Sequence, residues 1–531
     1  MSRRAASFAL LAACARGASV WPLPASISLD GRVIALSDSF TFTTTTPTPL
    51  LAAAFDRYAA ILALRAPPLT PTNATPAPSA PPLAALAVAL RSTDEALDVG
   101  TSEAYNLTVD AHAATLAADT VFGALRGLET FAQLVEARGA GGAARVVAAA
   151  AVADSPRFAH RGALVDTARH FIPLRVLFDF IDAMAANKMN VFHWHLTDDQ
   201  SFPYVSAALP ALAAEGAFGK LASHTYAPAD VAAVIAYARA RGVRVVSEFD
   251  TPGHTMSWGA GAPGLTTTCF APNGSVTGTG PVDPTREENF AIIGALIAEA
   301  ASVFPDAYMH IGGDEVDYTC WKSNPGVVAW MAAHGMAGNF SALESYFVQR
   351  VIGLVAAAGK RAVGWQELYD NRLALPAGTI VDVWKYHSFP CQAPPLPPKP
   401  TWQSEIANVT AAGFFAILSS PWYLNVISYG VDWPPYYAAD PTDFEGTAEQ
   451  KARVLGGELS MWGEWADSTN LISRTWPRGS AVAERLWSPA STTDVGDATR
   501  RIAELRCRLV ARGLAAGPLG PGYCPGEFDA R

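Results

Sequence analysis

The sequence predicts an α/β protein in which a (β/α)8 TIM barrel follows a small α/β domain. Beyond residue 155, short β-branched or aromatic runs alternate with Ala- and Leu-rich stretches, which is typical of parallel βα units. Eight such runs occur within about 350 residues, the number and length expected of a barrel with insertions. We therefore expect a first domain at 20–155 and a barrel at 156–531 that ends in a helix.

The eight predicted strands share apolar side chains and are followed by reactive or ring-bearing residues. They cover residues 162–166, 189–195, 243–249, 308–311, 362–365, 380–384, 414–418 and 455–461. The C-terminal ends of barrel strands meet on one face, where such barrels keep their active sites. The residues there are Arg169, Asp198, Asp199, Glu248, Asp250, His254, Asp314, Glu315, Trp365, Glu367, Trp384, Tyr423, Asn425, Trp462 and Glu464.

The region before the barrel begins with a segment that predicts export. Arg3 and Arg4 precede an Ala- and Leu-rich stretch and then small residues, so residues 1–19 have the pattern of a secretory signal peptide. Sequons for N-glycosylation occur at Asn73, Asn106, Asn273, Asn339 and Asn408. Further along, we expect an exposed Pro/Ala/Thr-rich loop at 67–82, a strand at 105–109 and a helix at 122–134.

The amino-acid composition argues for a globular protein and against two other classes, nucleic-acid-binding and membrane-spanning proteins. Half of the 531 residues are apolar, so the chain can bury a large core. The net charge of −10 and the absence of a Lys/Arg cluster argue against a nucleic-acid partner. No segment after the signal has about 20 uninterrupted apolar residues, so no membrane span is predicted.

The segment from Ala307 to Glu315 is the most informative part of the chain. An apolar run ends in Gly312-Gly313, which lets the backbone turn and approach a ligand closely, and Asp314 and Glu315 follow. Neighbouring side chains of an extended chain point in opposite directions, so these carboxylates are poorly placed to flank one glycosidic bond as acid and nucleophile. We expect them to have different roles. A solvated acidic turn is the alternative.

Aromatic residues at the strand ends favour a sugar site. Trp365, Trp384 and Trp462 accompany Tyr423 and several carboxylates, and pyranose faces stack on aromatic rings while hydroxyl groups need polar partners. Any one of these tryptophans could instead belong to the core. Three of them at strand ends make a sugar pocket the better interpretation.

Seven motifs make the chain resemble glycoside hydrolase family 20, the β-N-acetylhexosaminidases. They are Leu164 to His170, Asn190 to Asp199, Glu248 to His254, His310 to Glu315, Gly364 to Glu367, Pro421 to Asn425 and Met461 to Glu464. The first domain matches more loosely, through Phe122 to Phe131. The resemblance implies an exo-acting, retaining enzyme without cofactor or metal. Its substrate would be a glycan with a terminal β-linked N-acetylglucosamine or N-acetylgalactosamine, and a homodimer is possible by analogy.

The family uses the substrate's 2-acetamido oxygen as nucleophile, which explains adjacent carboxylates. The resemblance implies that Glu315 is the general acid and base, and that Asp314 orients the acetamido group and stabilises an oxazolinium intermediate. Tyr423 would hydrogen-bond the acetamido oxygen. The implied substrate-binding and supporting residues are Trp365, Trp384 and Trp462 as pocket walls, Arg169, Glu464 and Asn425 at the ring hydroxyls, and Asp198, Glu248 and His254 as a charged shell around Glu315.

The cysteines fit the same resemblance. Cys269 with Cys320 and Cys507 with Cys524 resemble two disulfides of the family, which leaves Cys391 as an unpaired thiol. Relatives that act on anionic sugars have a basic residue where this chain has Val426, so the resemblance does not imply activity on sulfated substrates.

Two other classes of function remain open at this level. His193 and His195 lie at i and i+2 on one predicted strand and could bind a metal with an aspartate, as in a metal-dependent hydrolase. A carbohydrate-binding barrel that has lost turnover is the non-enzymatic alternative. A chitinase of the related substrate-assisted type would need an Asp-X-X-Asp-X-Asp-X-Glu strand, which the sequence lacks.

Overall fold

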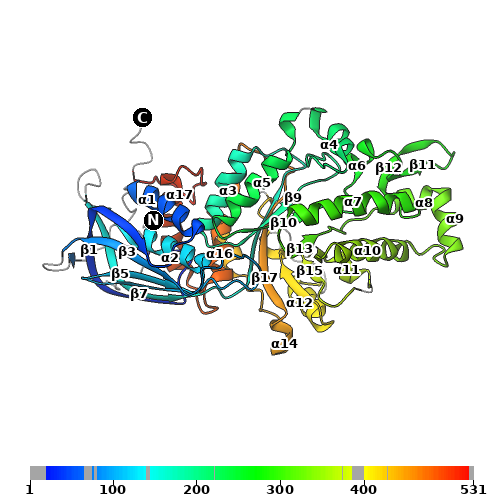
Figure 1. Cartoon of the computed structure of the whole chain (residues 1–531). Helices are drawn as coiled ribbons and strands as arrows, with labels where there is room; N and C mark the ends of the chain where they lie inside the picture. The colour runs from blue at the N-terminus through cyan, green and yellow to red at the C-terminus, as the bar shows by residue number, and fades with distance from the viewer. Residues whose placement is uncertain are drawn as a thin grey trace, which may run out of the picture.

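A computed structural model describes residues 19–64, 75–76, 81–138, 144–220, 222–373, 375–385, 400–426 and 429–525. Apart from Ser19, the predicted signal peptide lies outside these residues, as do Cys391, Asn73 and most of the predicted 67–82 loop. Figure 1 shows an elongated molecule with a sheet-and-helix domain at one end and the barrel at the other.

The N-terminal domain is a seven-stranded sheet in the order β2-β1-β3-β5-β4-β7-β6, covered by two helices. Its elements are β1 (Ser26–Thr44), α1 (Pro49–Ala63), β2 (Thr75–Pro76), β3 (Leu83–Leu90), β4 (Tyr105–Val109), β5 (Ala114–Ala118), α2 (Val121–Leu134), β6 (Val135–Arg138) and β7 (Ala144–Asp154). Side chains of β4 and β5 alternate between buried and exposed, because only one face packs against the helices. The strand predicted at 105–109 and the helix predicted at 122–134 are confirmed.

The barrel closes with eight parallel strands in the order β10-β13-β14-β15-β16-β17-β8-β9, which confirms the predicted fold class. These strands are β8 (His160–Asp166), β9 (Val191–His195), β10 (Arg244–Glu248), β13 (Tyr308–His310), β14 (Arg361–Trp365), β15 (Ile380–Val383), β16 (Phe415–Leu418) and β17 (Val454–Met461). Each overlaps one of the eight predicted runs. The strand interiors are almost fully buried, as expected where helices cover a parallel sheet.

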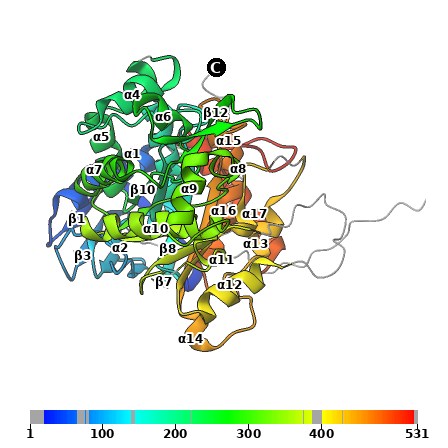
Figure 2. The same cartoon turned by 90° about the vertical axis from the view of Figure 1, so that its right-hand side faces the viewer.

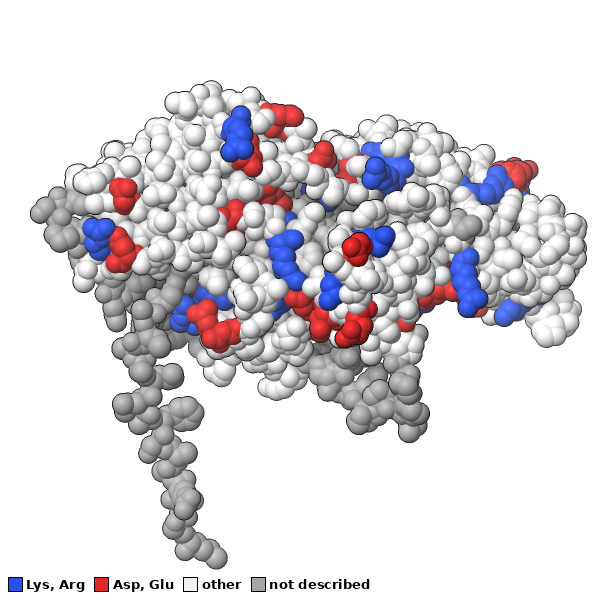
Figure 3. All heavy atoms as spheres, turned by 90° about the horizontal axis from the view of Figure 1, so that it is seen from below, with Lys and Arg blue, Asp and Glu red and all other residues white. Residues whose placement is uncertain are grey.

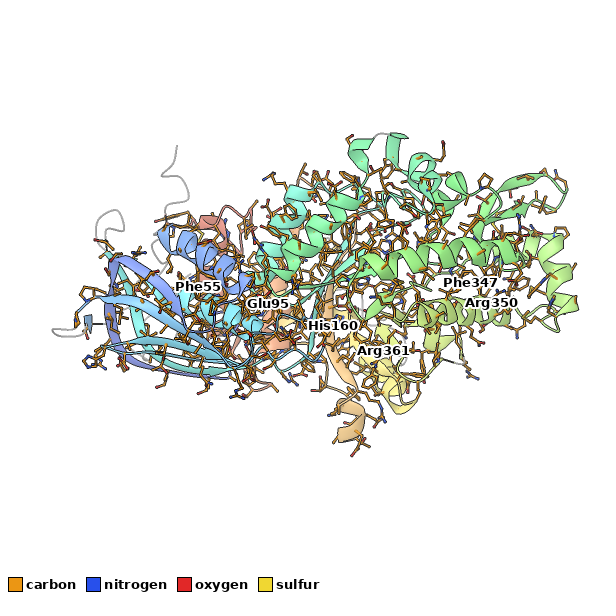
Figure 4. All side chains as sticks on the ribbon, viewed as in Figure 1. Phe55, Glu95, His160, Phe347, Arg350 and Arg361 are labelled. Carbon is orange, nitrogen blue, oxygen red and sulfur yellow. A yellow bond between two sulfur atoms is a disulfide. The ribbon has the colours of Figure 1, made fainter. Side chains whose placement is uncertain are left out.

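Helices surround the barrel and extend it at one end. Those between or after the strands are α3 (Leu174–Ala186), α5 (Pro228–Arg239), α7 (Glu287–Val303), α10 (Phe340–Ala357), α12 (Trp402–Ala411), α16 (Arg478–Trp487) and α17 (Val495–Ala511). Shorter insertions include α8 (Thr319–Ser323), α9 (Pro325–Ala333) and the hairpin of β11 (Thr266–Phe270) and β12 (Val276–Val282). They lie at the end of the molecule farthest from the N-terminal domain, where Figure 4 labels Phe347 and Arg350 on α10.

The N-terminal domain packs against the N-terminal ends of the barrel strands through buried charges. From α2, Arg126 donates to Gly242 O at 2.7 Å and to Glu103 at 2.7 Å. Arg161 on β8 donates to the same Glu103 at 2.5 Å, and Lys188 lies 2.9 Å from Asp154. Figure 2 looks onto the opposite end of the barrel, with the N-terminal domain behind it. The face at the C-terminal ends of the strands is therefore left free of the N-terminal domain.

The surface carries interspersed charges. On the face shown in Figure 3, Lys and Arg side chains lie among Asp and Glu side chains without forming a broad patch of one sign. Within the described ranges, no helix is both long enough and apolar enough to cross a bilayer.

Candidate active site

The loop after β13 has a backbone that only its glycines allow. Gly312 has φ +69°, and a Cβ built there would lie 1.6 Å from Oδ1 of Asp250. Gly313 has φ +94°, and its N–H donates to Asp250 Oδ1 at 2.9 Å. The predicted close turn is confirmed, because a side chain at 312 would displace Asp250 and the residues that follow.

Asp314 and Glu315 both face His254. Its Nε2 lies 3.8 Å from Asp314 Oδ2 and 3.9 Å from Glu315 Oε2. The expectation that the two side chains point in opposite directions is wrong, because Glu315 has φ +48° and the chain is not extended there. Their surroundings still differ strongly, since the Asp314 side chain is 11% exposed and that of Glu315 is 61% exposed.

Asp250 is a buried carboxyl group next to Asp314. Burial raises the pKa of Asp250, and the charge of Asp314 and a hydrogen bond between the two carboxyl groups raise it further. Asp250 therefore holds its proton more strongly than an ordinary aspartate does.

A chain of carboxylates and imidazoles connects the strand ends. Glu248 contacts His195 Nδ1 at 2.6 Å, and His195 Nε2 contacts Asp198 at 3.0 Å. Asp198 also lies 3.3 Å from His254 Nδ1 and 2.7 Å from Arg169. The three predicted shell residues, Asp198, Glu248 and His254, are thus joined through His195.

The shell holds fixed charges around neutral pH. Burial lowers the pKa of His254, but the hydrogen bond to Asp198 and the charges of Asp250 and Asp314 raise it to about 11. Burial would raise the pKa of Asp198, yet its hydrogen bonds from His195 and His254 and the charge of Arg169 hold that pKa well below its ordinary value. A protonated His254 therefore faces Asp314 and Glu315.

Aromatic rings form a cluster beside these carboxylates. Trp365 and Trp462 are buried, with ring centroids 5.7 Å apart, and Tyr423 lies 6.5 Å from Trp462 and 6.1 Å from Trp384. Trp365 Nε1 donates to Glu248 at 2.8 Å, which connects the aromatic cluster to the charged shell of Asp198, Glu248 and His254. Burial raises the pKa of Tyr423, so its hydroxyl remains a hydrogen-bond donor.

The residues predicted to bind the sugar hydroxyl groups, Arg169, Glu464 and Asn425, differ in their contacts with the rest of the site. Arg169 lies 5.1 Å over the Trp462 ring, is held by Asp166 at 3.0 Å, and feels the charge of the exposed Glu464. The carbonyl of Asn425 accepts from Arg474 at 2.8 Å, while its buried Oδ1 has no hydrogen-bond partner among the described residues. The contacts described above join every residue that the resemblance implies to be catalytic, substrate-binding or supporting into one group, except Asn425.

Glu367 was expected at a strand end without an assigned role, Lys385 was not predicted, and both belong to the site. Trp384 Nε1 donates to Glu367 at 2.9 Å, and Lys385 Nζ lies 3.0 Å from the other carboxylate oxygen. Burial raises the pKa of Glu367 to about 7, and the charge of Asp314 contributes. Glu367 stands at a strand end in the sequence, but its pairing with Trp384 depends on the alignment of two strands. Asp250 was also expected at a strand end without an assigned role, and its i+2 relation to Glu248 could have suggested one.

The histidines considered as metal ligands face carboxylates. His193 Nδ1 lies 2.6 Å from Glu458 and its Nε2 lies 3.1 Å from Glu248, while His195 bridges Glu248 and Asp198. Nδ1 of His193 and both ring nitrogens of His195 are thus hydrogen-bonded to carboxylates, whereas Nε2 of His193 has only an ion-pair contact.

The family model described as "Glycosyl hydrolase family 20, catalytic domain" matches residues 158–490, which span the whole barrel and every strand end described above. The chain belongs to glycoside hydrolase family 20. A second family model, "beta-acetyl hexosaminidase like", matches residues 20–134 in the N-terminal domain.

Relatives within family 20 match nearly the whole chain. "Beta-hexosaminidase subunit beta" of Mus musculus is 42% identical over 98% of this chain and 95% of its own length. "Beta-hexosaminidase subunit alpha" of Bos taurus is 48% identical over 82% of this chain and 80% of its own length. Among solved structures, the chitobiase of Flavobacterium johnsoniae has a TM-score of 0.80 at 28% identity, with 94% of this chain and 73% of that chain covered.

Two disulfides are present in the structure, Cys269–Cys320 and Cys507–Cys524. The first joins β11 to α8, two insertions that follow the β10 and β13 ends of this family 20 barrel. The second ties the C-terminal segment to α17.

Proposed function

We propose that this protein is an exo-acting β-N-acetylhexosaminidase that hydrolyses terminal N-acetylglucosamine or N-acetylgalactosamine with retention of configuration. The observation that carries the proposal is the pair of carboxylates on one imidazole, one buried and one exposed, beside a cluster of aromatic rings. Such a pair suits an acid and an acetamide-orienting group. It does not provide two carboxylates on opposite sides of a glycosidic bond.

In the first step the acetamido oxygen of the substrate attacks the anomeric carbon, and the bond to the leaving oxygen breaks. Glu315 donates its proton to that oxygen, and the sugar becomes an oxazolinium ion. Asp314 accepts a hydrogen bond from the acetamido N–H and stabilises the positive charge that develops on the acetamido group. Protonated His254 lies within 4 Å of both carboxylates and fixes their positions.

In the second step Glu315, now ionised, takes a proton from water. The water oxygen bonds to the anomeric carbon, the bond to the acetamido oxygen breaks, and the sugar leaves with its original configuration. The exposure of Glu315 suits both exchanges, because the leaving group and the water approach from solvent.

The pocket residues select the substrate. Tyr423 donates to the acetamido oxygen, and Trp365, Trp384 and Trp462 enclose the methyl group and the sugar face. Arg169 and Glu464 bind the outer hydroxyl groups, and the unpaired Oδ1 of Asn425 offers an acceptor near the 6-position.

The same proposal extends to the organisation and location of the chain. We place a signal peptide at 1–19, the first domain at 20–155 and the catalytic domain at 156–531, with delivery through the secretory pathway to a lysosome, a vacuole or the exterior. Two disulfides and four exposed sequon asparagines, Asn106, Asn273, Asn339 and Asn408, support this route. A homodimer is part of the proposal by analogy with the family.

The test compares release of chromophore from an aryl N-acetyl-β-glucosaminide and from the matching glucoside without the acetamide. We expect turnover of the acetamido substrate only, and a loss of about 10²- to 10⁴-fold in kcat for Glu315→Gln. Equal turnover of both substrates would mean a protein nucleophile. Binding without turnover would indicate a carbohydrate-binding barrel, and loss of activity with a chelator would indicate a metal-dependent hydrolase.

A further inference from the structure

A cavity lies where the N-terminal domain meets the barrel, and none of the candidate active-site residues lines it. Its volume is about 270 Å³, and it is lined by α1, by α3 and the residues after α5, and by the segment that follows α17. In Figure 1, α1 and α17 run close together above the N-terminal sheet, with α3 beside them. Its polar lining includes Arg57, Asp182, Arg241, Glu129 and Arg512.

Both carboxylates of this cavity already have cationic partners. Glu129 accepts from Arg512 through both oxygens, at 2.8 and 3.0 Å, and from the hydroxyl of Tyr58 at 3.1 Å. Asp182 accepts from Arg241 and, at 2.8 Å, from the hydroxyl of Tyr237. These pairs leave neither carboxylate available as a close partner for a third cation.

Arg57 is that third cation. It is partly buried on α1, and it makes no hydrogen bond or ion pair with any residue that the structure describes. Residues 65–80, which follow α1, contain no Asp or Glu that could neutralise it. Burial lowers the pKa of Arg57 and so does the nearby charge of Arg241, while Tyr58 and the charges of Asp182 and Glu129 oppose this change, and the group remains protonated. A guanidinium in such surroundings is stabilised by an anion.

We propose that this cavity binds a small organic monoanion, a carboxylate with a short aliphatic chain. Three arginines face two carboxylates, so the lining has one excess positive charge, which matches a single negative charge. The guanidinium of Arg57 lies 5.4 Å from the centroid of the Tyr58 ring and can still bind a carboxylate through two parallel hydrogen bonds. Ala60, Ile61, Leu64 and Leu514 provide the apolar wall for the chain.

The position of the cavity gives binding a structural effect. Arg57 belongs to the N-terminal domain, Ala185 and Ala186 to the barrel helix α3, and Leu514 to the C-terminal segment. A ligand that contacts all three parts only in the folded protein stabilises their association. This inference does not depend on the proposed glycosidase activity.

The experiment measures binding of hexanoate by titration calorimetry and thermal unfolding, in a chloride buffer at a pH of about 6.5, where the carboxylate is ionised and arginine is protonated. We expect hexanoate to bind and to raise Tm, and Arg57→Gln to weaken binding at least tenfold. Arg57→Lys, which keeps the charge, should retain part of the affinity. Arg175→Gln, a change on an exposed arginine of α3, should bind as the unchanged protein does.

Three results would overturn the proposal. Equal affinity for hexanol and hexanoate would show that charge is not recognised. Full affinity of Arg57→Gln for hexanoate would remove Arg57 from the site, and loss of hexanoate binding at saturating N-acetylglucosamine would place hexanoate in the active site. Because Arg57 makes no hydrogen bond with the described residues, the Gln variant is expected to fold, and its unfolding curve without ligand checks this.

Discussion

Replacing Glu367 by Gln should change how the stability of the protein depends on pH. The Glu367 side chain is 12% exposed, and burial raises its pKa from an ordinary value of 4.5 to about 7. A carboxyl group with a higher pKa in the folded state stabilises the fold fully below the unfolded value. That contribution is lost as the pH rises from the unfolded value through the folded value.

The magnitude follows from the two pKa values. At about 1.4 kcal/mol per pH unit, the rise from 4.5 to about 7 corresponds to about 3 kcal/mol. The glutamine side chain does not titrate, yet its amide oxygen can still accept the hydrogen bond from Trp384. We therefore expect the free energy of unfolding of Glu367→Gln, relative to the unchanged protein, to increase by about 3 kcal/mol between a pH of about 4.5 and about 7.5.

Urea unfolding followed by tryptophan fluorescence across this pH range measures the difference. Glu464→Gln is the matched control, because it makes the same change at a carboxyl group that is exposed. A difference for Glu367→Gln that stays constant across the pH range would refute the reasoning. It would mean that Lys385 keeps Glu367 ionised throughout.

Three further changes test other parts of the site. Gly312→Ala should abolish most activity, because its Cβ would lie 1.6 Å from Asp250 Oδ1; Gly338→Ala, with a similar φ but open space, should keep full kcat. Asp198→Asn should lower kcat/KM for the aryl N-acetyl-β-glucosaminide by about 10²-fold, since Arg169 and His254 lose their shared anion; an unchanged value would contradict this role of Asp198. Removing Cys269–Cys320 should cost about 4 kcal/mol in urea unfolding and removing Cys507–Cys524 about 3 kcal/mol, because the closed loops span 51 and 17 residues; a reversed order would argue against the chain-entropy account.

The strands and most of the site could be predicted because the information is local. Apolar runs mark the eight barrel strands, and in a parallel barrel the residues that follow them must converge. The glycines at 312 and 313 predicted a close turn for the same reason. The strands and the turn can each be recognised from a few consecutive residues.

What the sequence could not predict depends on backbone angles and strand alignment. The positive φ of Glu315 brings both carboxylates to one imidazole. A glutamate at that position does not predict a positive φ. The hydrogen bond from Trp384 to Glu367 and the bridge of His195 between Glu248 and Asp198 join residues from different βα units. Such contacts follow from the closed barrel and not from spacing along the chain.

The ion pairs between the two domains also limit how the chain can be truncated. Arg161 and Lys188 are buried in the barrel, and their partners Glu103 and Asp154 belong to the first 155 residues. Leaving a buried charge without its partner costs about 3–5 kcal/mol each, so two such losses approach the whole stability of an ordinary domain. A barrel expressed alone would therefore fold poorly although it contains every proposed catalytic residue. The N-terminal domain acts as a permanent intramolecular counter-ion for the barrel, and minimal enzymes designed from this chain need to keep it.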